Sequence, residues 1–270
     1  KEELGADGAL LRDENFFIYK VNLIEKLLAT VLAKVSNFIP EAGIWMNTQR
    51  PEWNDANNAL VGNGVSMVTL NYLNRFINFF EKVVLKSAIE EVEISLELTV
   101  FFNEVLATFN QNKDILKGSV SDKQRKTVLD GLGEAGSTYR TTIYEYGFSS
   151  DRSKVTKTAL LEFFTITKQY LEHTIKANKR SDNLYHSYNL MTIKNDTEVV
   201  VSYLPEMLEG QVAVLSAGYL SSKEALEVLD GMKQSALFRE DQYSYILYPN
   251  KELARFDEKN VISKAAVENS

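Results

Sequence analysis

Residues 64–84, GVSMVTLNYLNRFINFFEKVV, contain the clearest helical pattern of the chain. Apolar side chains recur there every three or four residues, the spacing that places them on one face of an α-helix. This stripe consists of Val65, Val68, Tyr72, Phe76, Phe80 and Val83, widened by Leu73, Ile77 and Val84. So broad an apolar surface predicts a long helix that is buried on more than one side.

The same periodicity continues on both sides of this helix. Only four prolines and 13 glycines interrupt the 270 residues, and sparse helix breakers favour long helices. Further helices are expected at residues 18–38, 89–109, 121–146, 154–178, 206–218 and 222–236. Long helices with short connections predict an all-α fold of stacked αα-hairpins. We expect a single helical domain over residues 1–270, either complete or a fragment of a longer chain.

One region departs from the helical pattern. Residues 184–204 contain two β-prone segments around the turn residues Lys194, Asn195 and Asp196, and the second segment includes three consecutive valines at 199–201. β-Branched residues on both sides of a short polar turn are typical of a β-hairpin. We therefore expect a small hairpin within the helical domain.

Charge and hydropathy exclude two classes of partner. The net charge is −7 and no basic block stands out, so binding to a phosphate backbone is disfavoured and no nucleic-acid partner is expected. No run of about 18 uncharged apolar residues occurs, so we expect no membrane partner. The oligomeric state cannot be read from these features.

The residue types also restrict the chemistry. The chain contains no cysteine, and its histidines are His173 and His186. Thiolate nucleophiles, Cys-ligated zinc and His-rich metal sites are therefore excluded. A carboxylate-oxygen site for a hard cation stays open, but neither a metal nor a cofactor is expected. Asp and Glu remain the natural acid and base groups for any catalysis.

Residues 40–63 interrupt the helices and hold both tryptophans, Trp45 and Trp53. Next to Trp53 and Asn54 lie two carboxylates, Glu52 and Asp55. Glycoside cleavage needs a proton donor at the leaving oxygen and a second group on the opposite face of the sugar. This segment could supply the donor, while indole rings could stack on sugar rings. Core packing of the tryptophans and capping by Asp55 is the alternative interpretation.

The stretch PEWNDA at residues 51–56 resembles the Asp-Trp-Asn-Asp motif of cellobiose and chitobiose phosphorylases. These enzymes belong to the six-hairpin glycosidase superfamily, whose domain is an α/α toroid. Two further stretches, LYHSYN at 184–189 and MLEGQ at 207–211, resemble parts of large bacterial proteins related to those enzymes. A full toroid has twelve helices and this chain offers six or seven, so the resemblance implies a partial toroid, a fragment or a reduced relative.

The resemblance also implies roles for individual residues. Asp55 would be the general acid, Glu52 stands in place of the family's first aspartate, and Glu209 would act as a base or sugar-binding group. Substrate binding would involve Trp45, Trp53, Arg50, Asn54, His186 and Tyr188. Among these, His186 would bind an inorganic phosphate. For His186, a strand histidine bonded to the backbone is the alternative; for Glu209, a carboxylate at a helix start.

These expectations converge on a carbohydrate-active protein that binds an oligosaccharide and cleaves or phosphorolyses it. Two other functions stay open from the sequence, a non-catalytic carbohydrate-binding domain and a helical protein-interaction domain. Because a fold does not fix a function, the site residues have to decide between them.

Overall fold

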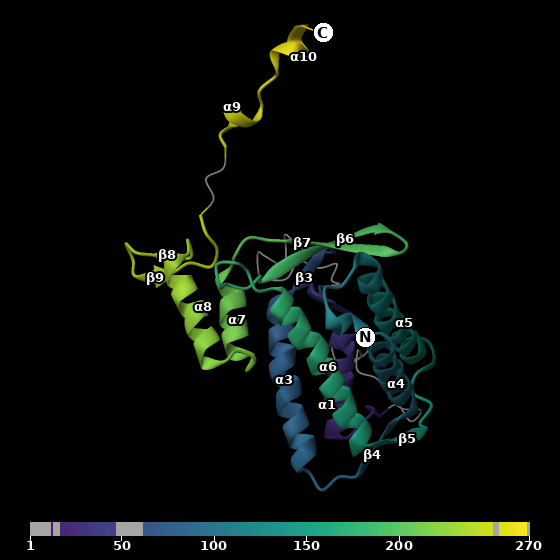
Figure 1. Ribbon diagram of the computed structural model, residues 1–270. Helices are drawn as coiled ribbons and strands as arrows, with labels where there is room; N and C mark the ends of the chain where they lie inside the picture. The colour runs from purple at the N-terminus through teal and green to yellow at the C-terminus, as the bar shows by residue number, and fades with distance from the viewer. Residues whose placement is uncertain (1–11, 13–16, 47–61, 251–253, 269–270) are drawn as a thin grey trace.

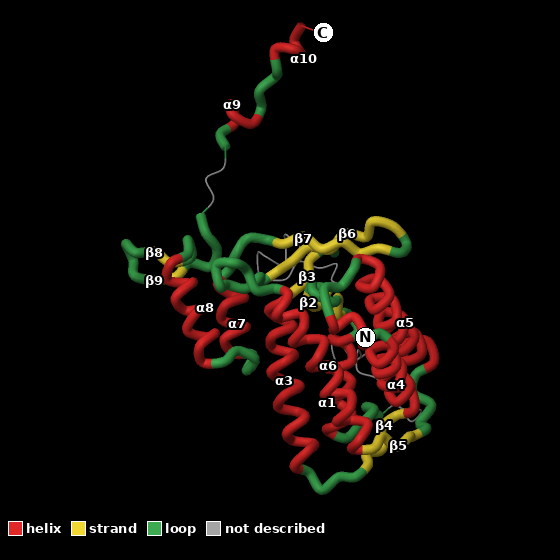
Figure 2. Tube along the Cα trace, in the orientation of Figure 1, coloured by secondary structure: helices red, strands yellow, loops and turns green. Residues whose placement is uncertain are grey.

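The computed structural model describes residues 12, 17–46, 62–250 and 254–268. The protein is 56% helical and 17% strand, and it contains a curled, five-stranded antiparallel sheet. The long helices run side by side, and the sheet lies across one end of them (Figures 1 and 2). The expectation of an all-α fold is therefore wrong.

Five long helices form the body of the molecule. They are α1 (Leu23–Val35), α3 (Met67–Lys86), α4 (Leu96–Gln111), α5 (Asp122–Tyr146) and α6 (Lys157–Ala177). The closest helix pairs are α4 with α5 and α3 with α6. Because α3 packs on α6 and not on α4, the next long helix of the chain, these helices are not a series of consecutive hairpins. This arrangement contradicts the toroid-like stacking expected from the sequence.

Side-chain caps explain where the helices begin. Ser66 accepts a hydrogen bond from the Thr69 amide at the start of α3, and Thr156 accepts one from the Ala159 amide at the start of α6. Ser121 forms a capping box with Gln124 at the start of α5. Each such cap typically contributes about 1 kcal/mol by satisfying an amide that lacks a helical partner.

The five-stranded sheet has the order β1-β2-β3-β6-β7. Its strands are β1 (Phe38–Ile39), β2 (Gly43–Trp45), β3 (Gly64–Ser66), β6 (Tyr188–Asn195) and β7 (Glu198–Tyr203). The hairpin expected within residues 184–204 is present as β6 and β7. Strands β1 and β2 come from residues expected to form a helix end and a loop, and β3 replaces the expected start of the helix at residues 64–84.

A second pair of strands also replaces expected helix. Strand β4 (Glu91–Ser95) pairs with β5 (Arg152–Thr156). The sequence EVEIS of β4 alternates charged and apolar residues, which is the period of a strand and not of a helix. The helix expected from residue 89 therefore begins only at Leu96.

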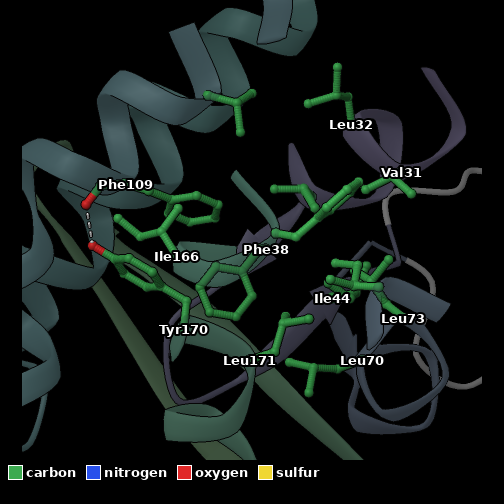
Figure 3. Packing of buried hydrophobic residues seen from close by; sticks show 14 of the residues in the cluster. Val31, Leu32, Phe38, Ile44, Leu70, Leu73, Phe109, Ile166, Tyr170 and Leu171 are labelled. Atoms are coloured by element: carbon green, nitrogen blue, oxygen red, sulfur yellow. Dashed lines mark hydrogen bonds between the residues drawn. The ribbon is translucent and has the colours of Figure 1, made fainter. Parts of the chain in front are cut away.

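The main core lies between the helices and is rich in aromatic residues. The rings of Phe109 and Tyr170 stack with centroids 4.4 Å apart, and Phe38 meets each of them edge-on at 6.1 Å. The Tyr170 hydroxyl donates to the Phe109 carbonyl oxygen at 2.8 Å (Figure 3). This bond satisfies the one polar atom of a fully buried tyrosine, and Phe38 links the sheet to the helical core.

The C-terminal part adds smaller elements. Helix α7 (Leu208–Ser216) packs on α3, and α8 (Ser222–Gln234) packs on α7 (Figure 1). The C-terminal part also contains β8 (Phe238–Arg239), β9 (Ser244–Tyr245), α9 (Phe256–Lys259) and α10 (Lys264–Glu268). A short 3-10 helix, η2 (Lys113–Lys117), lies between α4 and α5. Residues 254–268 extend away from the body. No helix within the described ranges is long and apolar enough to cross a membrane.

Candidate functional site

The predicted site residues fall into two groups. Arg50, Glu52, Trp53, Asn54 and Asp55 lie outside the described residues. The other four, Trp45, His186, Tyr188 and Glu209, have defined surroundings. They are the part of the sequence-based site that geometry can address.

The turn before β2 sets the position of Trp45. Gly43 has φ +129°, and a Cβ atom at this position would lie 2.8 Å from the Ser66 carbonyl oxygen. A residue other than glycine would therefore strain the turn and push β2 away from β3. This close approach allows Trp45 to pair with Val65 in the register of the two strands.

The Trp45 side chain is half-buried and offers mainly carbon surface. Its Nε1 atom donates to the Gly62 carbonyl oxygen at 3.0 Å. The ring packs against a small apolar cluster between the sheet and α5, formed by Ile39, Ala42, Val65, Leu129, Met191 and Val199. Because the only polar atom of the indole is already bonded, the ring is suited to stacking and not to hydrogen bonding with a ligand.

Trp45 lines a hollow of about 330 Å³ between the sheet and α5. We call this hollow the Trp45 groove. Besides Ser36 and Asn37, which follow α1, its polar side chains come from α5, and they are Lys126, Asp130, Glu134, Ser137 and Arg140. Their spacing of three or four residues places them along one face of the helix. The groove therefore combines an aromatic wall with a row of donors and acceptors.

The charges of the groove are mixed. Lys126 and Asp130 form an ion pair at 2.5 Å. Arg140 is exposed and donates to the Ser137 hydroxyl at 3.1 Å. Glu134 is also exposed and forms no ion pair within the described part of the chain. The basic side chains of this set can donate hydrogen bonds to the hydroxyl groups of a neutral ligand, and the carboxylates can accept hydrogen bonds from them.

A buried arginine holds α5 against the sheet. Arg125 is 5% exposed and pairs with Glu41 at 3.2 Å and with Asp122 at 2.6 Å. It also donates to three backbone oxygens at 2.9–3.1 Å, those of Pro40, Val120 and Val199. Because these partners belong to the β1–β2 turn, the start of α5 and β7, Arg125 fixes one end of the Trp45 groove.

Tyr188 and Glu209 lie on the other face of the sheet. Trp45 is aligned with Val65 and Asn189 across β2, β3 and β6, whereas Tyr188 is aligned with Ser66 one residue further along. Neighbouring residues of a strand point to opposite faces. The sheet therefore separates Tyr188 from Trp45, and the two do not line one site.

On that second face Tyr188 and Glu209 bind each other. The Tyr188 hydroxyl donates to Glu209 Oε2 at 2.5 Å. Burial, followed by this bond and the negative charge of Glu209, raises the pKa of Tyr188 far above its usual range. Glu209 lies in the first turn of α7, where a carboxylate is favoured by the helix dipole. Its observed contacts match the alternative interpretation of Glu209 as a helix-start carboxylate.

His186 has a similar structural setting. Its ring stacks on Tyr203 with centroids 4.5 Å apart, and Nδ1 lies 3.2 Å from the Leu204 carbonyl oxygen. Burial lowers the pKa of His186, which favours the neutral ring at neutral pH. The nearby Arg180 is paired with Asp182 at 2.7 Å and with Glu206 at 3.1 Å. The positive charge of Arg180 is therefore already matched by two carboxylates, and the role expected for His186 in binding phosphate stays a prediction.

The polar row on α5 was not recognised from the sequence. Its residues fall in the polar positions of an amphipathic helix, which ordinarily face solvent. Only the packing of α5 against the sheet places them beside Trp45. The described residues contain no cluster of three or more His, Asp or Glu side chains that could hold a metal ion.

Comparison with known proteins leaves the family open. The chain matches no protein-family model. No curated protein matches its sequence at a significant level. The resemblance to six-hairpin glycosidases therefore stays a prediction that rests on three short motifs.

Proposed function

We propose that the protein binds an oligosaccharide in the Trp45 groove. The observation that supports this proposal is the position of the Trp45 indole. Its N–H is hydrogen-bonded to the Gly62 carbonyl oxygen, and its ring lines a groove that Glu134 and Arg140 of α5 also line. Sugar rings have an apolar C–H face and a polar rim. An aromatic wall beside a row of donors and acceptors complements both features.

The size of the groove restricts the ligand. Sites for small molecules commonly have volumes of about 300–1,000 Å³, and the Trp45 groove, at about 330 Å³, lies at the lower end. It suits a short segment of an oligosaccharide. The mixture of Lys126, Asp130, Glu134 and Arg140 favours a neutral sugar over a strongly charged one.

Cleavage or phosphorolysis remains the catalytic part of the proposal. It rests on the resemblance of residues 51–56 to the phosphorylase motif, with Asp55 as the acid. The phosphate-binding role expected for His186 gains no support from its neutral, stacked ring. Hydrolysis by Asp55 and a second carboxylate is therefore the form of catalysis that we propose to test first.

Tryptophan fluorescence tests the binding. A Trp53→Phe variant leaves Trp45 as the only indole, so any response to ligand then reports on the groove. Titration with a panel of β-linked oligosaccharides should give a saturable change for at least one member. That change should need about five- to tenfold more ligand in Trp53→Phe/Glu134→Gln. It should be unaltered in Trp53→Phe/Glu145→Gln, because Glu145 is an exposed residue of α5 outside the groove.

The catalytic part needs a separate experiment. An oligosaccharide that binds should be incubated with the unmodified protein and with Asp55→Asn, and released sugars should be measured with and without phosphate. Release that depends on Asp55 supports catalysis. Binding without release leaves the protein as a non-catalytic carbohydrate-binding domain.

A further inference from the structure

A second hollow of about 290 Å³ lies between α4, α5 and the loop that leads to β5. We call it the α4–α5 cavity. Its floor is an aromatic pair, because Phe101 and Tyr139 stack with centroids 5.0 Å apart and an angle of 19° between the rings. Leu96 and Val100 are partly exposed to solvent and line the same hollow. The cavity is therefore mainly apolar.

Three carboxylates also line this cavity. Glu97 and Glu104 lie on α4 on either side of Phe101, at helical spacing, and Asp151 lies in the loop before β5. The loop is fixed to the start of α4, since the Leu96 amide donates to the Asp151 carbonyl oxygen at 3.0 Å. The aromatic floor and the three carboxylates thus line the same cavity.

Among the residues that the structure describes, no positive side chain pairs with these carboxylates. None of the three forms an ion pair within residues 17–46, 62–250 and 254–268, and the lining described for the cavity contains neither Lys nor Arg. Glu97 Oε1 accepts a hydrogen bond from the Ser149 amide at 2.8 Å. Its Oε2 atom is buried and has no hydrogen-bond partner among the described residues. Because this oxygen has almost no accessible surface, the carboxylates that a ligand in the cavity can reach are those of Glu104 and Asp151, which are exposed.

The charge states agree with this geometry. Burial opposes ionisation of Glu97, but hydrogen bonds from Ser149 outweigh it and lower the pKa of Glu97. Burial, and then the negative charges of Glu25 and Glu97, raise the pKa of Tyr139 to about 12. At neutral pH the cavity therefore presents an ionised Glu97 next to the neutral phenol of Tyr139.

We propose that the α4–α5 cavity binds a small organic cation, a primary ammonium attached to an aromatic or aliphatic body. The body would lie on Phe101 and Tyr139, and the ammonium would donate to Glu104 and Asp151, with the charge of Glu97 close by. A cation near an aromatic face is also attracted by the ring itself. The carboxylates are not gathered closely enough to hold a metal ion among the described residues, which favours a larger cation.

Calorimetric titration with a matched pair of probes tests this proposal. The probes are 3-phenylpropylammonium and 3-phenylpropanoate, which share a phenyl ring on a short chain and carry opposite charges. The cation should bind saturably and at least tenfold more tightly than the anion. Equal binding of the two probes, or no binding of the cation, would overturn the proposal.

Three variants locate the bound cation. Glu104 and Asp151 are exposed, so Glu104→Gln and Asp151→Asn should fold normally and each weaken binding about five- to tenfold. Val100→Trp should fill the mouth and abolish binding. Glu134→Gln, a charge-matched change in the Trp45 groove, should leave it unchanged. Binding that survives all three cavity variants would place the cation elsewhere and contradict the proposal.

Discussion

Helix α5 contributes to two hollows of similar volume but different chemistry. The Trp45 groove, about 330 Å³, has an indole wall and charges of both signs. The α4–α5 cavity, about 290 Å³, has a Phe101–Tyr139 floor and carboxylates without a described basic partner. One side of α5, from Lys126 to Ser137 with Arg140, lines the first hollow, and Thr138, Tyr139 and Thr142 line the second. Aromatic surface is common to both, so the surrounding charge decides which ligand each can bind.

The largest expected effect comes from separating α5 from the sheet. Arg125→Ala would leave the largely buried Glu41 carboxylate without its cation, and breaking such a buried pair typically costs about 3–5 kcal/mol. The free energy of unfolding, measured in urea, should fall by this amount. Lys126→Ala is the matched control, because its ion pair with Asp130 is partly exposed and should contribute less than about 1 kcal/mol.

If Arg125→Ala remains folded at low temperature, titrating it with both ligands tests whether the two hollows are independent. Oligosaccharide binding should be lost, because Arg125 fixes the Trp45 groove, whereas binding of 3-phenylpropylammonium should persist. Equal loss of both would show that the two hollows are not independent.

Two glycines of α5 should respond in opposite directions to alanine. A Cβ at Gly136 would lie 2.8 Å from both side-chain atoms of the buried Ser36, so Gly136→Ala should destabilise the protein by about 1–3 kcal/mol. A Cβ at Gly133 would meet no atom within 4 Å. Gly133→Ala should therefore stabilise the helix by about 0.5–1 kcal/mol. Thermal unfolding of the two variants checks both signs, and the same sign for both would contradict the packing described for α5.

Charge removal should discriminate between the two hollows. Glu134→Gln should weaken oligosaccharide binding about five- to tenfold and leave ammonium binding unchanged, and Glu104→Gln should do the reverse. A tenfold change corresponds to about 1.4 kcal/mol, the scale of one hydrogen bond to a charged group. Titrating both variants with both ligands gives four affinities. A variant that weakens both ligands equally would indicate a general loss of structure.

The smallest expected effect concerns His186. Burial lowers the pKa of His186 below its ordinary value of 6.5, so the unfolded chain binds a proton first as the pH falls. The stabilising contribution is therefore present above about pH 6.5 and is lost as the pH falls through the lowered folded pKa. NMR titration should show a pKa for His186 below 6.5. A value at or above 6.5 would mean that the ring is hydrated and open to an anion.

The sequence predicted the helices better than the strands because of their lengths. An apolar repeat across 20 residues of α3 is unambiguous, whereas β1, β2 and β3 have two or three residues each and show no measurable period. The β6–β7 hairpin was predicted because its strands are longer and flank a recognisable turn. Pairing between β3 and β6 joins residues more than 100 positions apart, which no local pattern can indicate.

The candidate site was predicted only in part for the same reason. Trp45 was recognised by its residue type, but its partners Glu134 and Arg140 lie on a helix about 90 positions later and have an ordinary surface pattern. Tyr188 and Glu209 were expected to share its site, yet the strand register places Tyr188 on the opposite face of the sheet. Long-range packing, and not residue type, thus decides which groups meet.

The indole N–H resonance of Trp45 offers the most direct test of the proposed sugar site. In ¹⁵N-labelled Trp53→Phe protein this resonance is the single indole N–H signal. The hydrogen bond to the Gly62 carbonyl oxygen should protect the proton from exchange with water and give a narrow line. Addition of a β-linked oligosaccharide from the panel should shift this signal saturably, and Glu134→Gln should weaken the response. An indole signal that stays unchanged across the whole panel would contradict carbohydrate binding at the Trp45 groove.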